Sequence, residues 1–237
     1  MKSLWKKVLA GILAAASALS LTVCTNSETL QEGGQSGSTG QQSVPATDPD
    51  GGNILIAYFT AAENSGVDAV ASASYTTIEG QAVGRVRAVA DMIQENIGGD
   101  LFSIRTSVVY PTDGGELIDY AAQEQDENAR PELTSHIENL DKYDTIFIGY
   151  PNWWADLPMA VYSFFDEYDF SGKTIIPFNV HNGSRFSRTI QTIEELEPNA
   201  TAIEDGFTVS ERTVADAAED VAAWLDGLGY STEGGLA

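Results

Sequence analysis

Residues 145–154 constrain the fold more than any other stretch of this chain. They begin as an almost continuously apolar run, rich in β-branched and aromatic side chains, from Thr145 to Tyr150. Such a run is typical of a strand that is buried on both faces of a parallel sheet. Pro151 ends this strand, because proline has a fixed φ and no N–H to donate to a neighbouring strand. The chain therefore places Trp153 and Trp154 just after a central strand.

The segment of residues 151–154 is the first predicted binding site. In an open α/β sheet, ligands bind outside the carboxyl ends of the central strands. Large, flat, apolar side chains at that place suit a flat aromatic ligand. We therefore interpret Pro151, Asn152, Trp153 and Trp154 as ligand-binding residues. The alternative is that both tryptophans close the core against the following helix.

From residue 53 onward, strand patterns alternate with helix patterns. Short apolar runs predict strands at residues 53–60, 100–105, 145–150, 173–179 and 200–204. Apolar residues at helical spacing predict helices around residues 86–97, 117–122, 157–168, 186–196 and 214–228. This alternation predicts an α/β fold, a three-layer, doubly wound, five-stranded parallel sheet.

Residues 1–24 have the layout of a secretory signal peptide, in which a basic start precedes an apolar run. Cys24, the only cysteine of the chain, ends this segment in a sequence that resembles a bacterial lipobox. Val23 departs from the lipobox pattern, and residues 16–18 offer an ordinary signal-peptidase site instead. We expect a lipoprotein that is secreted across the cytoplasmic membrane, with a membrane anchor on Cys24 that holds it on the outer face.

The composition of the remaining segments sets the domain boundaries. Residues 25–52 are rich in Gln, Gly, Ser and Thr, which predicts a disordered linker. A single folded domain is expected over residues 53–230, followed by a flexible tail at residues 231–237.

The charge and the cysteine count exclude several classes of function. The formal net charge of −23 argues against nucleic acid, whose phosphates require Lys and Arg. It favours small-molecule ligands or basic partners. A single cysteine rules out a disulfide framework and a cysteine-based zinc site, and the two histidines lack the spacing of metal ligands. We therefore expect no metal.

Four segments resemble those of the flavodoxin-like family of bacteria. They are residues 54–59 (ILIAYF), 149–154 (GYPNWW), 158–162 (PMAVY) and 170–178 (FSGKTIIPF). The resemblance extends from about residue 53 to residue 230 and implies a flavodoxin-like domain with strand order 2-1-3-4-5. It also implies FMN as the cofactor, bound across the carboxyl ends of the strands, an arrangement of which flavodoxin is a standard example.

The resemblance places the FMN phosphate at the loop after the first strand. Flavodoxin-like proteins carry a hydroxyl-rich loop there that ends in Gly-Asn-Thr, and N–H groups at the start of the first helix assist it. Thr60 matches the opening hydroxyl, but Gly-Arg-Val at residues 84–86 stands where Gly-Asn-Thr is expected. The long intervening loop contains Ser72, Ser74, Thr76 and Thr77, which can supply the missing hydroxyl groups.

Arg85 and Arg87 lie in the first turn of the predicted helix, where the helix dipole disfavours cations. In a chain with only 12 basic residues, this placement indicates a nearby anion. We expect both arginines to face the FMN phosphate, with Arg85 as the cofactor-binding residue. The alternative is that both arginines pair with Glu79 or Asp91 on a solvated surface.

A third loop, after the fourth predicted strand, lies at the same edge of the sheet. Asn179, His181 and Asn182 can donate or accept hydrogen bonds at the pyrimidine edge of a flavin, and a backbone N–H near Gly183 can tune the ring. The alternative for His181 is a loop side chain that faces water.

These patterns predict an FMN-binding flavoprotein that acts in electron transfer outside the cytoplasm. The redox partner stays open, and so does the choice between a carrier and an oxidoreductase that reduces a small acceptor such as a quinone. The rival from another class is a flavin-free binding module that kept the fold and lost the phosphate loop. The altered segment at residues 84–86 is the feature that favours this rival.

Overall fold

The computed structural model describes residues 53–64 and 74–230. The predicted signal peptide, Cys24, the linker, Ser72 and the C-terminal tail lie outside the described residues. One parallel sheet contains β1 (Ile54–Tyr58), β4 (Asp100–Ser103), β5 (Thr145–Pro151), β6 (Thr174–His181), β7 (Thr201–Ala202) and β8 (Phe207–Ser210). The order is β4-β1-β5-β6-β7, and β8 also pairs with β6. This confirms the predicted order 2-1-3-4-5, with β7 and β8 sharing the fifth position.

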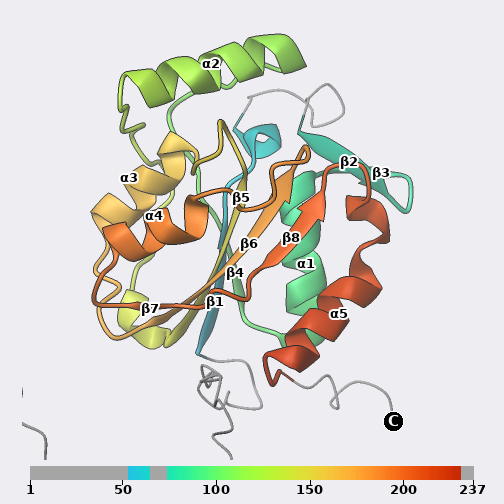
Figure 1. Cartoon of the computed structure of the whole chain (residues 1–237), viewed down its shortest axis with the longest axis vertical. Helices are drawn as coiled ribbons and strands as arrows, with labels where there is room; N and C mark the ends of the chain where they lie inside the picture. Colours follow the sequence, from blue (N-terminus) through green and yellow to red (C-terminus); the bar gives the residue numbers. More distant parts are fainter. Residues whose placement is uncertain (1–52, 65–73, 231–237) are drawn as a thin grey trace, which may run out of the picture. The chain divides into compact units, whose positions relative to one another are not determined.

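Helices cover both faces of this sheet (Figure 1). α1 (Arg85–Ile97) and α5 (Ala218–Gly227) lie on one face, and α3 (Met159–Glu167) and α4 (Thr189–Leu196) lie on the other. The alternation of side chains along a strand divides the core: Ile54 and Ile56 of β1 face α1, whereas Leu55 and Ala57 face the second layer. Within the two described ranges, no helix is long and apolar enough to cross a membrane.

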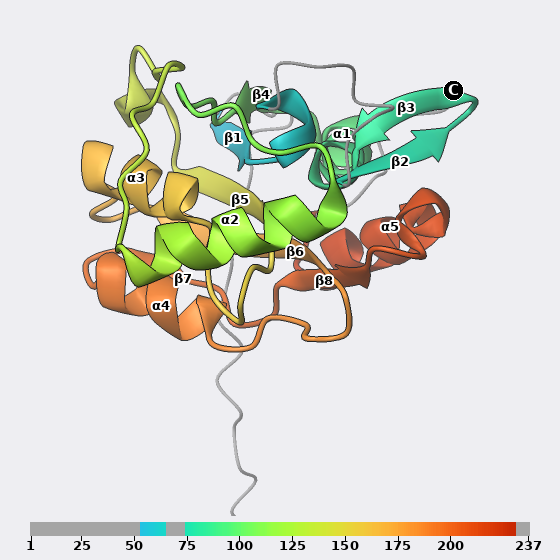
Figure 2. The ribbon, with the colours of Figure 1, turned by 90° about the horizontal axis from the view of Figure 1, so that it is seen from above.

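The remaining helix, α2 (Gly114–Asp126), lies across the edge of the sheet at which the parallel strands end (Figures 1 and 2). It begins at a clear cap, because Oδ1 of Asp113 accepts hydrogen bonds from the N–H groups of Gly115 and Glu116. Leu117 and Ala121 are buried on its inner side. α2 therefore forms a wall above the strand ends.

The segment before α1 differs from the single long loop that the sequence predicts. It contains an antiparallel hairpin of β2 (Tyr75–Ile78) and β3 (Gln81–Gly84). Glu79 and Gly80, with φ of 51° and 81°, form the connecting turn, and positive φ at both central positions is what a tight hairpin requires. Thr76 and Thr77 are consequently strand residues, paired with Val83 and Ala82.

A glycine of β5 and an aromatic ring of β6 approach each other closely. Gly149 pairs with Phe178, and the Phe178 ring lies over the glycine. A Cβ atom at Gly149 would lie 2.2 Å from Cζ of Phe178. Phe178 is completely buried, so its ring fills the space that a side chain at residue 149 would need.

The sheet edge beside β6 is interrupted at Pro177. The carbonyl oxygen of Ile175 accepts a hydrogen bond from the N–H of Ile203 at 2.8 Å, so every second residue of β6 faces this edge. Pro177, two residues later, faces the same edge without an N–H. β7 pairs with β6 before the proline and β8 after it, which explains why one predicted strand at residues 200–204 is replaced by two short ones.

Candidate functional site

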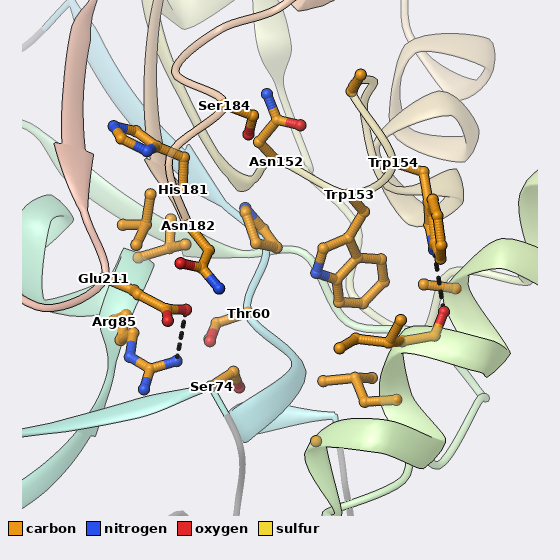
Figure 3. Close-up of a pocket in the computed structure, with 18 residues that line it drawn as sticks. Thr60, Ser74, Arg85, Asn152, Trp153, Trp154, His181, Asn182, Ser184 and Glu211 are labelled. Atoms are coloured by element: carbon orange, nitrogen blue, oxygen red, sulfur yellow. Dashed lines mark hydrogen bonds and ion pairs between the residues drawn. The ribbon is translucent and has the colours of Figure 1, made fainter.

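A pocket of about 630 Å³ opens where the strands end. This volume lies within the range of roughly 300–1,000 Å³ that is usual for small-molecule sites. Its walls come from the end of β1, the start of α1, the inner side of α2 and the segments after β5, β6 and β8 (Figure 3). The lining residues are Thr60, Ser74, Arg85, Val86, Gly114, Leu117, Ile118, Ala121, Pro151, Asn152, Trp153, Trp154, Ala155, Val180, His181, Asn182, Ser184 and Glu211.

One end of the pocket is apolar. The Trp153 ring packs edge-on against Phe59 and Tyr110, with centroids 5.5 and 5.7 Å away. Trp154 is 56% exposed, and its Nε1–H donates a hydrogen bond of 3.0 Å to the carbonyl oxygen of Ile118 in α2. Trp153 is thus fixed by core contacts, whereas Trp154 ties its loop to α2 at the rim.

A tight turn presents both tryptophans to the pocket. Trp153 and Asp156 exchange two backbone hydrogen bonds of 3.1 and 3.0 Å. The two residues between them, Trp154 and Ala155, have φ of 51° and 65°. Residues other than glycine adopt this left-handed conformation at a cost of roughly 1–2 kcal/mol each. Such strain persists only where neighbouring contacts hold it, and it is common at binding sites.

The side chain of Asp156 fixes this turn through hydrogen bonds. Its carboxylate accepts hydrogen bonds from the N–H of Leu157 at 2.9 Å, the hydroxyl of Thr192 at 2.8 Å and the hydroxyl of Tyr162 at 3.1 Å. Arg188 Nε lies 3.8 Å away. Asp156 is only 8% exposed, so this carboxylate joins the turn to α3 and α4.

Tyr110 supports Trp153 from the core side and contacts a buried carboxyl group. Its hydroxyl lies 3.3 Å from both carboxyl oxygens of Glu124 in α2. Burial raises the pKa of Glu124 to about 7, because a carboxylate loses hydration there. The carboxyl group is therefore partly protonated at neutral pH. This reduces the negative charge of Glu124 next to the apolar end of the pocket.

The opposite end of the pocket is polar. Figure 3 shows Thr60, Ser74, Arg85, Asn182 and Glu211 converging there from five segments of the chain. The hydroxyl oxygen of Thr60 is buried and has no hydrogen-bond partner among the residues that the structure describes. Buried hydroxyl groups are rarely left unpaired, so this oxygen is suited to a polar group of a ligand.

Gly84, just before α1, allows the close approach of Thr60. A Cβ atom at residue 84 would lie 2.7 Å from Oγ1 and 2.8 Å from Cγ2 of Thr60. Any side chain would push the start of α1 away from the end of β1. The N-terminus of a helix, with its N–H groups and dipole, favours a negative charge.

The structure separates the two arginines of this helix. Arg85 lines the pocket, and its Nη1 lies 3.6 Å from a carboxylate oxygen of Glu211. Arg87 instead bonds Asp91 Oδ1 through Nε at 2.6 Å and the hydroxyl of Tyr58 through Nη1 at 2.7 Å. The surface alternative thus describes Arg87. Of the two arginines that we expected at the phosphate, only Arg85 lines the pocket.

The loop after β6 lies at the rim between the two ends. His181 Nδ1 accepts a hydrogen bond of 2.8 Å from the N–H of Gly183, which leaves Nε2 as the donor in the neutral ring. Burial and the nearby Arg185 lower the pKa of His181, against an opposing effect of Glu211, so the ring is neutral at pH 7. Asn182 is exposed and lines the pocket.

Two asparagines fix this loop. Asn179 is fully buried, donating to the carbonyl oxygen of Arg185 at 2.9 Å and accepting from the Thr208 hydroxyl at 2.6 Å. Asn152 donates to the same carbonyl oxygen at 2.6 Å. Its own Oδ1 is buried without a partner in the described part of the chain, and Asn152 lines the pocket. Asn152 therefore offers an acceptor to a ligand, whereas the amide of Asn179 is already used.

Most of the predicted site residues come together in this pocket. Nine of them line it: Thr60, Ser74, Arg85, Pro151, Asn152, Trp153, Trp154, His181 and Asn182. The other four do not line it: Thr76 and Thr77 lie in the hairpin, Asn179 lies beneath the loop and Gly183 follows Asn182. In the described ranges, no group of three or more His, Cys, Asp or Glu side chains is placed to hold a metal ion.

Sequence reasoning missed Glu211 and the contribution of α2. Phe207 and Val209 alternate with polar residues, a pattern that indicates a half-buried strand. Glu211 follows that strand directly, at the edge where ligands bind. Leu117, Ile118 and Ala121 are recognisable as a helix, but only the tertiary structure shows that this helix covers the strand ends.

Comparisons with known proteins agree with this architecture. Residues 72–228 match the model of the family described as Flavodoxin. A comparison with curated protein sequences gives no match.

Solved structures with the same fold include proteins from three bacteria. A protein from Bacteroides eggerthii, provisionally described as a flavoprotein, is 26% identical, with 75% of this chain and 98% of that chain covered and a TM-score of 0.56. A similarly described protein from Bacteroides uniformis is 25% identical, with coverages of 71% and 99% and a TM-score of 0.52. A flavoprotein from Lactobacillus acidophilus, crystallised in complex with FMN, is 16% identical, with coverages of 70% and 98% and a TM-score of 0.50.

Proposed function

This chain belongs to the flavodoxin family, and from that membership we propose that it binds FMN in the pocket at the carboxyl edge of its sheet and transfers electrons. The cofactor is FMN, as it is in the solved complex of the Lactobacillus acidophilus flavoprotein. The bound isoalloxazine ring would supply the redox chemistry. The protein supplies position, hydrogen bonds and an electric field.

The observation that carries this proposal is the match between the two ends of the pocket and the two ends of FMN. Trp153 and Trp154 offer aromatic faces and edges to the flavin ring. At the polar end, the buried and unpaired hydroxyl of Thr60 lies with Ser74 and Arg85, beside the start of α1 (Figure 3). Hydroxyl groups, a guanidinium and a helix N-terminus are the usual partners of a phosphate.

The residues between the two ends would orient the ring. Oδ1 of Asn152 can accept a hydrogen bond, and neutral His181 can donate one through Nε2. Because the histidine is uncharged, it would not stabilise negative charge on the ring as a cation would. The visible absorption spectrum of the purified protein tests the proposal. A flavin spectrum, or one that develops on addition of FMN, supports it, whereas no binding at micromolar FMN would favour the flavin-free module.

Replacement of Arg85 by glutamine should weaken FMN binding by about 1–2 kcal/mol, roughly 5- to 30-fold, because one charge-assisted contact to the phosphate is lost in a partly exposed site. Riboflavin lacks the phosphate, so its affinity should not change. Titration of the apoprotein with both flavins, followed by flavin fluorescence, measures the difference.

Arg87→Gln is the matched control, because it removes the same charge from the same turn of α1 but from a side chain that bonds Asp91 and Tyr58. Its FMN affinity should stay within about twofold of the parent value, since it makes no pocket contact. Equal FMN affinity in the parent and Arg85→Gln would show that another group holds the phosphate.

We further propose that this activity takes place outside the cytoplasm, on a protein tethered by a lipid at Cys24. The basic and apolar character of residues 1–24 supports this proposal. Cys24→Ser should move the protein from the detergent phase of a membrane extraction to the aqueous phase, or leave it unprocessed. A parent protein found only in the aqueous phase, and cleaved after Ala18, would contradict the lipid anchor.

A further inference from the structure

Glu211 places a carboxylate in the polar end of the pocket. It is the residue after β8, and its backbone N–H donates a hydrogen bond of 2.8 Å to the carbonyl oxygen of His181. Its carboxylate lies 3.6 Å from Nη1 of Arg85 (Figure 3). The two side chains are 30% and 26% exposed, so the pair is only partly screened by water.

This carboxylate has the same sign of charge as a phosphate and the same partner. A phosphate that binds Arg85 must share the guanidinium with Glu211 or displace it. Sharing brings two anions close together where water screens them weakly, which disfavours the complex. Displacement of the carboxylate is limited to side-chain rotation, because the hydrogen bond from the Glu211 N–H to His181 fixes the backbone.

A ligand without a phosphate does not meet this opposition. A ribityl chain carries hydroxyl groups and no charge, so it brings no second anion to Arg85 and leaves the pair of Arg85 and Glu211 in place. The pair of Arg85 and Glu211 therefore changes the affinity for a charged group at the polar end. It does not change the contacts of the flavin ring at the tryptophan end.

From this geometry we infer that Glu211 is a specificity-determining residue, which competes with the ligand phosphate for Arg85 and weakens the binding of FMN relative to riboflavin. The inference rests on the proposed function, since it concerns the same pocket and cofactor. The protein should therefore prefer FMN over riboflavin less strongly than it would if Arg85 stood there without Glu211.

The test compares the parent with Glu211→Gln, which keeps the length of the side chain and removes its charge. Each protein is titrated with FMN and with riboflavin at low ionic strength, followed by flavin fluorescence. Glu211→Gln should bind FMN about tenfold more tightly, because a like charge near the phosphate is gone. Its riboflavin affinity should not change.

Asp166→Asn is the matched control. Asp166 also forms a partly exposed ion pair, with Arg130, but it lies near the end of α3 and does not line the pocket. Asp166→Asn removes one negative charge from the same acidic chain, as Glu211→Gln does. Any general effect of net charge on FMN affinity should therefore be equal in the two variants. FMN affinity should be the same in Asp166→Asn and the parent.

A second measurement is independent of flavin binding. Inorganic phosphate should raise the thermal unfolding midpoint of Glu211→Gln more than that of the parent, because the variant lacks the negative charge that competes with the anion at Arg85. If neither protein binds flavin, the proposed function fails, and this phosphate measurement alone decides on Glu211.

Two flavin results would overturn the inference. Equal FMN affinity in the parent and Glu211→Gln would mean that the carboxylate does not oppose the phosphate. Weaker binding of both flavins by the variant would mean that Glu211 accepts hydrogen bonds from the ligand. In the absence of flavin binding, equal phosphate-induced shifts would also overturn it.

Discussion

Replacement of Gly149 by alanine should lower the free energy of unfolding by about 3 kcal/mol, because extra atoms in a packed core force strain of this size. The new Cβ would lie 2.2 Å from Cζ of Phe178. The Phe178 ring is completely buried between the sheet and the helices on that face, so it cannot rotate into solvent. Chemical denaturation of the two proteins measures the change.

Gly227→Ala is the control for this substitution. Gly227 is the last residue of α5, and a Cβ atom there would have no neighbour within 4 Å among the described residues. The substitution should be neutral or stabilise the protein by up to about 1 kcal/mol, since alanine favours the helix more than glycine does. Similar destabilisation by both substitutions would show that the close contact with Phe178 is not the cause.

Asp156→Ala should lower the free energy of unfolding by about 3–4 kcal/mol, because the loss of a buried, hydrogen-bonded carboxylate leaves its partners unpaired. The hydroxyls of Thr192 and Tyr162 would each lose an acceptor. FMN binding should weaken as well, since the turn that presents both tryptophans would lose its anchor on α3 and α4. Denaturation and FMN titration give the two readouts.

Asp100→Ala provides the comparison for Asp156. Asp100 also accepts hydrogen bonds from two side chains, Lys142 and Tyr143, but its side chain is 54% exposed. Exposed ion pairs contribute about 0–1 kcal/mol, so Asp100→Ala should cost under about 1 kcal/mol and leave FMN affinity unchanged. An equal cost at the two positions would contradict the role given to burial at Asp156.

The sequence predicts well those strands whose own residues are apolar enough to require burial. β1, β5 and β6 are continuous apolar runs, and such runs suit only the centre of a parallel sheet. The hairpin of β2 and β3 and the strand β8 were not predicted, because they are short and partly polar. Their structure depends on the elements they pack against, which a local pattern does not reveal.

The same difference applies to the pocket. The order of elements places Thr60, Trp153 and His181 at strand ends, so a common edge follows from the topology. The pairing of Arg85 with Glu211 joins segments far apart in the sequence, and neither segment specifies the other. Arg85 and Arg87 have different partners because their side chains point in different directions at the start of α1. Helical periodicity does not determine these directions.

The break in the sheet at Pro177 has a consequence for contacts between molecules. An open sheet exposes rows of N–H and C=O groups at its edges, and a long exposed row can recruit a strand from another chain. β7 has 2 residues and β8 has 4, and the chain leaves the β6 ladder between them. β4, at the opposite edge, also has only 4 residues. Neither edge therefore offers a long, straight template, which protects the folded protein against edge-to-edge aggregation.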